Sequence, residues 1–273
     1  MEYIPIRCKT AIRKVRGRFP YDYDLNIYRG CEHGCLYCYA VYSHRYLNDE
    51  KFYEHIYYKE NILEVLEKEL SSPHWKREKI NLGSVCDSYQ PCERELQLMR
   101  GVLKLMIKYR NPILISTKSK LILRDLDLIA ELSALTDVHI VSTVTCADIF
   151  VQKIMEPYAS ISLERMKMLQ MMKQHTQAHI TILLMPIIPY INDSYENFEA
   201  IYELASQIGV EEIVPGVLYL RGPTKTYFLN KIKAYDKNLY QKIEYLYRKG
   251  SCDKAYKNQI YDCLSRVRQK YLL

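Results

Sequence analysis

The most informative feature of this chain is a run of three closely spaced cysteines in residues 28–40, YRGCEHGCLYCYA. Cys31, Cys35 and Cys38 follow a C-x3-C-x2-C spacing. Three thiolates on one short loop can ligate three irons of a single [4Fe–4S] cube. The fourth iron then has no ligand from the motif, and an open coordination position is typical of catalytic rather than structural metal sites. The spacing therefore predicts a catalytic iron–sulfur cluster.

Other roles for these cysteines fit the sequence less well. A structural zinc site usually has four ligands in two C-x2-C pairs, and the remaining cysteines of this chain stand singly. Nine cysteines in 273 residues are too few for a disulfide scaffold. The start, MEYIPIRCKT, has no apolar signal segment. We therefore expect free thiols in a reducing, cytoplasmic location.

The apolar pattern predicts one large α/β domain. An apolar content of 48% over 273 residues is enough for a sizeable core, and no apolar run is long enough to span a membrane. Apolar runs indicate six strands, at residues 25–28, 80–85, 112–117, 138–145, 179–186 and 211–220. Helical periodicity separates them, at residues 59–70, 93–109, 125–134, 162–175 and 195–207. This alternation predicts a parallel sheet closed into a partial (β/α)6 barrel over residues 25–222, with functional groups at the carboxyl ends of the strands.

The positive charge is concentrated at both ends of the chain. The net charge is +7, and residues 225–273 hold twelve Lys and Arg against four Asp and Glu. We divide off residues 1–24 as a basic N-terminal segment and residues 223–273 as a basic, Tyr-rich helical extension. Such termini indicate nucleic acid as a candidate partner, because cations release counterions from phosphate backbones. Solvated helix faces and aromatic packing between helices are the alternative reading of the same residues.

Polar segments follow four of the predicted strands. The carboxyl ends of parallel strands meet at one edge, so these segments should form a polar ring around the cysteine loop. They are GSVCDSYQPCE (83–93), STKS (116–119), VSTV (141–144) and MPIIPYIND (185–193). A lysine for a carboxylate and hydroxyls for a ribose and an amino group suit a zwitterionic nucleoside ligand.

Together these motifs resemble those of the radical S-adenosylmethionine (radical SAM) enzymes, and within them the spore-photoproduct-lyase-like branch. The resemblance spans about residues 5–222 and includes NIYRGCEHGCLYCYA, DSYQPCE, STKS, LRD (123–125), Glu156-Pro157 with Arg165, and PIIPYIND. It implies a [4Fe–4S] cluster on the three cysteines and SAM as the second cofactor. It also implies a flavodoxin- or ferredoxin-type electron donor and cleavage of SAM to a 5′-deoxyadenosyl radical that abstracts hydrogen from a substrate.

The resemblance also implies roles for individual residues. Ser88, Lys118 and Ser142 fall on positions that contact SAM, and Tyr37 is expected against its adenine. Cys86 falls on the position that returns a hydrogen atom to the product radical. Tyr37 and Tyr39, which flank the third cluster cysteine, fall on tyrosines implicated in the radical relay. For Cys86, a small buried residue that only fills space is the alternative.

Three functions remain open at this level. The first is repair of a DNA lesion, as in the lyase, and the second is radical chemistry on a small metabolite or a peptide. The third is a non-catalytic iron–sulfur redox sensor that binds nucleic acid. The DNA-inserting β-hairpin that follows strand six in the lyase has no match here, because the basic, Tyr-rich helices take its place.

Overall fold

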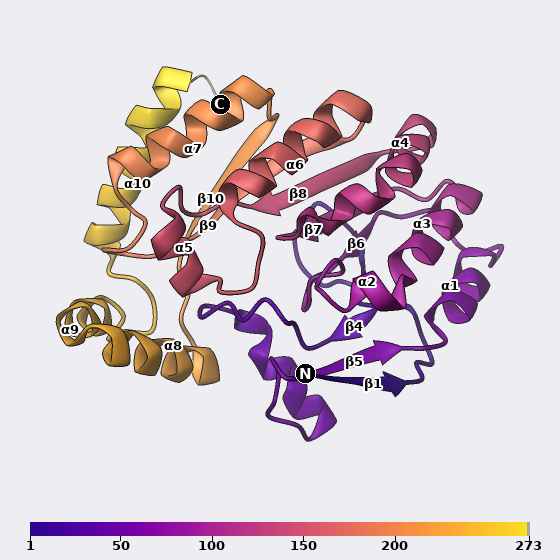
Figure 1. Cartoon of the computed structure of the whole chain (residues 1–273), viewed down its shortest axis with the longest axis horizontal. Coiled ribbons are helices and arrows are strands. Elements are labelled where there is room, and N and C mark those ends of the chain that lie inside the picture. Colours follow the sequence, from indigo (N-terminus) through magenta and orange to yellow (C-terminus); the bar gives the residue numbers. More distant parts are fainter. Residues whose placement is uncertain (272–273) are drawn as a thin grey trace.

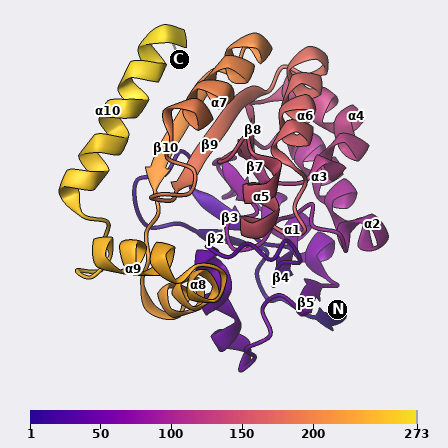
Figure 2. The same cartoon turned by 60° about the vertical axis from the view of Figure 1, so that its left-hand side comes forward.

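The computed structural model describes residues 1–271. Its centre is a sheet in the order β10-β9-β8-β7-β6-β3-β2 (Figures 1 and 2). The strands are β2 (Ile12–Lys14), β3 (Tyr23–Leu25), β6 (Ile80–Leu82), β7 (Ile113–Thr117), β8 (Val138–Thr143), β9 (His179–Ile187) and β10 (Glu212–Val217). Strands β3 to β10 pair in parallel and β2 is antiparallel to β3. The predicted α/β fold with a parallel sheet is confirmed, and the arrangement is that of a partial barrel.

Helices cover the outer face of this curved sheet (Figure 2). Leu25, Ile80 and Ile140 belong to one buried core with residues from these helices. Because strand side chains alternate between faces, the residues next to them point to the concave side. The covering helices are α1 (Ile62–Leu70), α3 (Leu98–Tyr109), α4 (Leu126–Leu135), α6 (Ser162–His175) and α7 (Tyr195–Ile208).

The first barrel strand differs from the prediction. The apolar run at residues 25–28 predicted one strand, but β3 ends at Leu25 and Tyr28 begins a short strand in a second sheet. The Asn26 side chain accounts for the break. Its Nδ2 donates a hydrogen bond to Ser84 Oγ and its Oδ1 accepts one from Val85 N. These bonds turn the chain out of the sheet after Leu25. The second sheet contains β1 (Glu2–Ile6), β5 (His55–Lys59) and β4 (Tyr28–Arg29). The cysteine loop therefore leaves from β4 and continues into the 3₁₀ helix η1 (Tyr39–Leu47).

The helix predicted over residues 93–109 is divided in two. Segment α2 (Glu93–Leu96) ends where Gln97 adopts a left-handed conformation with φ of 49°. The Glu93 carboxylate then accepts hydrogen bonds from Leu98 N and Met99 N and so caps the start of α3. Two further short elements, η2 (Lys120–Asp125) and α5 (Ile149–Met155), lie in the connections after β7 and β8.

The C-terminal extension packs against the cysteine loop. Its helices are α8 (Gly222–Tyr235), α9 (Lys237–Leu246) and α10 (Lys254–Tyr271). Helices α8 and α9 lie near the carboxyl ends of β9 and β10 (Figure 2). Phe228 and Tyr247 are fully buried in one core with Cys35 and Tyr37. Thr224 Oγ1 donates a hydrogen bond to the Cys38 carbonyl at 3.4 Å. For these aromatic residues, packing is the role that the structure shows.

None of the helices within residues 1–271 has the length and apolar character needed to cross a membrane.

Candidate active site

The three motif cysteines converge on one loop between β4 and η1. All three thiols are free; Cys35 is buried and the other two are half-buried. Burial raises the pKa of Cys31, and negative charge at Asp87, Cys35 and Cys38 raises it further. Burial also raises the pKa of Cys35 to about 12, against the opposing charge of Lys118. The thiols therefore lie within electrostatic reach of one another, as ligands of one polynuclear centre must.

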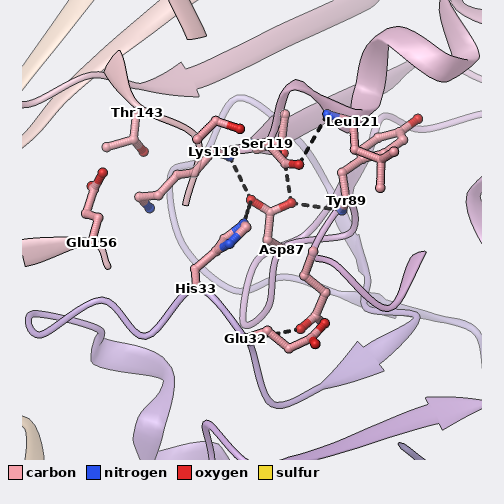
Figure 3. Close-up of polar contacts among 12 residues, drawn as sticks. Glu32, His33, Asp87, Tyr89, Lys118, Ser119, Leu121, Thr143 and Glu156 are labelled. Carbon is pink, nitrogen blue, oxygen red and sulfur yellow. Dashed lines mark hydrogen bonds and ion pairs between the residues drawn. The ribbon is translucent and has the colours of Figure 1, made fainter. Parts of the chain in front are cut away.

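Asp87 connects this loop to two strand ends (Figure 3). Its carboxylate contacts His33 Nε2 at 3.0 Å and accepts hydrogen bonds from Thr117 Oγ1 at 2.8 Å and from Lys118 N at 2.7 Å. Burial disfavours the carboxylate, but His33 and the backbone N–H groups of Lys118 and Tyr89 outweigh burial and lower the pKa of Asp87 to about 2. Asp87 is therefore a fixed negative charge that fastens His33 to the ends of β6 and β7.

A second carboxylate, Glu32, holds the beginning of the loop. Its side chain accepts hydrogen bonds from Cys92 N at 2.6 Å and Tyr3 OH at 2.9 Å. Gln90 reinforces this contact, because its amide accepts from Glu32 N at 2.9 Å and donates to the Gly30 carbonyl at 3.2 Å. The loop backbone is thereby hydrogen-bonded to the DSYQPCE segment that follows β6.

The third carboxylate, Glu156, holds the end of the loop. Tyr37 OH and Arg165 Nη2 both donate hydrogen bonds to it, and all three side chains are buried. Arg165 also donates to the Thr143 carbonyl at 2.8 Å and to the Ser160 carbonyl at 2.7 Å. A buried ion pair with these additional partners has one well-defined geometry. Tyr37 is thus anchored through its hydroxyl.

The three residues predicted to contact SAM come from three strand ends around this loop. The Lys118 side chain extends toward Glu156 and Thr143 (Figure 3), and its ammonium lies 5.7 Å from the centre of the Tyr37 ring. Burial opposes its charge, but the negative charges of Cys35 and Glu156 raise the pKa of Lys118. Ser142 Oγ donates to the Thr117 carbonyl at 2.8 Å. Ser88 is fully buried, and its hydroxyl has no hydrogen-bond partner within residues 1–271.

Cys86 and Tyr39 are connected through the segment after β6. The Cys86 thiol donates to the Tyr28 carbonyl at 3.2 Å and lies 3.8 Å from Asn26 Oδ1. Burial raises the pKa of Cys86 to about 12, so the sulfur keeps its hydrogen at neutral pH. Tyr39 has an exposed ring, and its hydroxyl donates to the Ser84 carbonyl. Ser84 Oγ in turn is hydrogen-bonded to the side-chain amide of Asn26.

Sequence reasoning assigned no role to the residues that hold the loop. Glu32 and His33 lie inside the cysteine motif, and Asp87 and Gln90 lie inside DSYQPCE, so each was visible as part of a quoted motif. Their partners are more than fifty residues away, and this separation hides the contacts from any local pattern. Thr224 gave no sequence signal.

The residues around the loop fit the cofactors that the motif predicts. Three free thiols on one loop suit a cube with one open iron. The unpartnered Ser88 hydroxyl and the Lys118 ammonium are donors left for a ligand. A side chain at Gly83 would place its Cβ 3.0 Å from the Ser116 carbonyl and 3.4 Å from Ser88 Oγ, so glycine keeps this space open.

Comparison with known proteins agrees with this geometry. A family model described as the radical SAM superfamily matches residues 25–205. The uncharacterized protein Rv2578c of Mycobacterium tuberculosis is 28% identical over 98% of this chain and 80% of its own length. The uncharacterized protein MJ0683 of Methanocaldococcus jannaschii is 31% identical over 71% of this chain and 70% of its own.

Solved structures of spore photoproduct lyase share the fold. The lyase complexed with dinucleoside spore photoproduct aligns with a TM-score of 0.68 at 12% identity, covering 98% of this chain and 79% of that chain. A lyase variant with bound AdoMet (SAM) and dinucleoside spore photoproduct aligns with a TM-score of 0.67 at 11% identity, covering 99% and 79%.

Asp87 should make the stability of the apoprotein depend on pH in acid. Its folded pKa of about 2 lies below the ordinary value of 3.8, so its contribution is present above about pH 4 and decreases as the pH falls toward 2. Between pH 6 and pH 3 this carboxylate should account for about 1 kcal/mol of lost unfolding free energy. Urea denaturation of wild type and Asp87→Asn at both pH values measures it. Equal losses in the two proteins would contradict the assignment.

Proposed function

Because the chain belongs to the radical SAM superfamily, whose members use a [4Fe–4S] cluster and SAM, we propose that its cysteine loop holds the cluster through Cys31, Cys35 and Cys38. When bound, these cofactors supply a 5′-deoxyadenosyl radical by reductive cleavage of SAM. The observation that carries the proposal is the convergence of three free thiols on a loop fixed by three buried carboxylates. That loop has little freedom to rearrange, so its sulfurs are preorganised as ligands.

We further propose that Ser88, Lys118 and Ser142 bind SAM. Lys118 offers an ammonium to a carboxylate. Burial opposes this charge, but the negative charges of Cys35 and Glu156 raise the pKa of Lys118. Ser88 offers a hydroxyl that no protein group uses. Ser142 donates to a backbone carbonyl and keeps lone pairs for an amino or hydroxyl donor. Tyr37, held by Glu156, presents its ring between Lys118 and the cysteine loop.

Cys86 is proposed as the hydrogen-atom donor to the product radical. A cysteine can donate a hydrogen atom only while its thiol is protonated, and the raised pKa of Cys86 keeps it so. Its hydrogen bonds to Tyr28 and Asn26 hold the sulfur at the end of β6, beside the segment that carries Ser88. Tyr39 reaches the same segment through Ser84, which supports a relay between the two side chains.

For the substrate we propose nucleic acid carrying a base lesion. The fold is that of spore photoproduct lyase, and strand β2 with the loop that follows it carries three exposed arginines, Arg13, Arg16 and Arg18. Phe19 in the same loop is 54% exposed and stacks on Tyr21 with ring centres 5.4 Å apart. Exposed cations with aromatic rings are the surface that unpaired bases and phosphates bind. The electron donor is proposed to be flavodoxin- or ferredoxin-like, and the reducing cytoplasm is the proposed location.

The cluster assignment predicts a loss of iron in cysteine variants. Anaerobic reconstitution of wild type should give close to four irons per chain, and dithionite with SAM should release 5′-deoxyadenosine. Cys31→Ala, Cys35→Ala and Cys38→Ala should each lose most of this iron and all SAM cleavage, because an open cube needs all three thiolates. Cys8→Ala, at a half-buried thiol outside the loop, is the control and should keep both. A Cys31→Ala variant that reconstitutes as well as wild type would refute the assignment.

The donor role of Cys86 predicts a solvent-derived hydrogen in the product. Thiol hydrogens exchange with water and carbon-bound hydrogens do not. With dinucleoside spore photoproduct in D₂O, wild type should therefore place deuterium in the repaired product, measured by mass spectrometry. Cys86→Ala should lower the yield of that labelled product at least tenfold while 5′-deoxyadenosine still forms. Cys92→Ala changes a neighbouring buried thiol and should retain labelling. Unchanged labelling in Cys86→Ala would assign Cys86 to packing alone.

The nucleic-acid proposal predicts strong salt dependence. If about three phosphates are neutralised, the affinity for a single-stranded oligonucleotide should fall by roughly 20-fold between 50 and 200 mM salt. Fluorescence anisotropy of the reconstituted protein with SAM measures this. Binding that is absent at 50 mM, or insensitive to salt, would favour a small metabolite or a peptide instead.

A further inference from the structure

Three side chains with metal-binding groups meet at the amino-terminal ends of β8 and β9. Asp137 immediately precedes β8, His139 is the second residue of β8, and His179 is the first residue of β9. The two histidines are direct partners in the parallel register of these strands. Ser142, a proposed SAM contact, lies near the carboxyl end of β8. The cluster is therefore at the opposite rim of the sheet from the candidate active site.

Strand alternation places the two imidazoles on the same face. Ile140 and Ile180 belong to the core that packs against the outer helices. Because successive side chains of a strand point to opposite faces, the neighbouring His139 and His179 point to the inner face. Their ring centres are 4.9 Å apart. The pairing of β8 with β9 thus holds two potential metal ligands side by side.

One carboxylate oxygen lies close to both imidazoles. Asp137 Oδ1 is 3.0 Å from His139 Nε2 and 3.9 Å from His179 Nε2. One ligand atom from each of the three side chains lies within 4.8 Å of the other two. Two ligands of a tetrahedral zinc ion at about 2.1 Å are about 3.4 Å apart. Small side-chain rotations would therefore bring the three atoms onto one ion.

The cluster is open to solvent, so an ion can reach it and the side chains can rotate. The side chain of His179 is 60% exposed, that of Asp137 43% and that of His139 27%. The most exposed ligand is also the one whose nitrogen lies farther from Asp137 Oδ1. It is the side chain that has to move, and it has the room to do so.

The contacts of His139 Nε2 cannot all be favourable at once. This nitrogen lies 3.0 Å from Asp137 Oδ1, which as a carboxylate oxygen only accepts hydrogen bonds. It also lies 3.3 Å from the Lys79 ammonium, which only donates them. A neutral imidazole nitrogen carries either a hydrogen or a lone pair, so each tautomer leaves one contact unsatisfied. A metal ion removes the conflict, because Nε2 and Oδ1 can both direct lone pairs at it.

Lys79 can keep its main contact when an ion is bound. Its ammonium pairs with the other carboxylate oxygen, Asp137 Oδ2, at 2.6 Å. Oδ1 and Oδ2 can therefore serve different partners, the ion and the lysine. A hydrogen bond to the second oxygen is the outer contact that typically orients a ligating carboxylate.

We propose that Asp137, His139 and His179 form a zinc site at the amino-terminal ends of β8 and β9. Two imidazole nitrogens and one carboxylate oxygen are ligands that Zn²⁺ binds readily, and a water molecule would complete the tetrahedron. With only three protein ligands the ion should bind reversibly and stabilise these strand ends in proportion to its concentration. The inference is separate from the proposed radical chemistry, because it uses none of the same residues.

The first experiment measures binding of Zn²⁺ to the reconstituted, SAM-loaded holoenzyme without a histidine tag, at pH 7.5. Equilibrium dialysis against 50 μM Zn²⁺ should give close to one zinc per chain with unchanged iron content. The Cys31→Ala/Cys35→Ala/Cys38→Ala apoprotein should bind the same amount, so the test does not depend on the cluster proposal. Failure of both proteins to retain zinc at 50 μM overturns the site.

X-ray absorption at the zinc edge identifies the ligands in the same samples. The expected neighbours are nitrogen and oxygen at about 2.0–2.2 Å, without sulfur at about 2.3 Å. A sulfur neighbour would place the zinc on cysteine thiolates and would contradict the assignment to Asp137, His139 and His179.

Histidine variants locate the ion within the chain. His139→Ala and His179→Ala should each weaken zinc binding at least tenfold, because only two of the three protein ligands remain. His179 is largely exposed, so its variant keeps the test valid even if His139→Ala folds poorly. His175→Ala removes another exposed imidazole, at the end of α6, and should keep its affinity within twofold of wild type. Unchanged affinity in His179→Ala, or an equal loss in His175→Ala, overturns the proposal.

Discussion

The fixation of a polar loop by buried carboxylates is the constraint on which the rest of the site depends. A loop that carries three thiols proposed as metal ligands cannot be held by apolar packing alone, because its own backbone groups need partners. Gln90 supplies partners for Glu32 N and the Gly30 carbonyl. The side chains of Glu32, His33 and Tyr37 then fasten the loop to Cys92 N, Asp87 and Glu156. A buried carboxylate is tolerated only when its hydrogen bonds are satisfied, so each contact has one favourable geometry. Burial opposes the charge of the nearby Lys118, but the negative charges of Cys35, Glu156 and Asp87 raise its pKa.

The parallel sheet was predictable because its strands are continuously apolar and its helices have their own periodicity. The errors occur where a side chain overrides the local pattern. Asn26 turns the chain out of the sheet within an apolar run, and the Glu93 carboxylate restarts a helix at Leu98. The strands β1, β2 and β5 are short and half-exposed. Strands β1 and β5 pair with each other across more than fifty residues, and β2 has only three residues, so no periodicity within them indicates a sheet.

The candidate site likewise has a part that local sequence predicts and a part that it does not. The chemistry was predictable from local spacing, because the three cysteines proposed as ligands of one cluster lie within eight residues. The supports could not be predicted, since His33 meets Asp87 across 54 positions and Tyr37 meets Glu156 across 119. Glu156 and Arg165 were visible as part of a resemblance, but only the structure shows them as one buried ion pair that also receives the Tyr37 hydroxyl. Many residues of the motifs therefore do not offer groups to a ligand. They form the hydrogen-bonded framework that positions the residues that do.

The two basic ends of the chain show why composition alone does not locate a binding surface. The C-terminal extension has the larger charge and more aromatic residues, yet Phe228 and Tyr247 are buried against the cysteine loop and most of its remaining rings are covered by cations. Its rings and charges are therefore largely engaged within the protein. The basic N-terminal segment has fewer cations, but Arg13 and Arg16 are exposed and line a hollow of about 780 Å³. The contacts that charged groups already make within the protein, rather than the number of charges, therefore indicate which of them are available to a polar ligand.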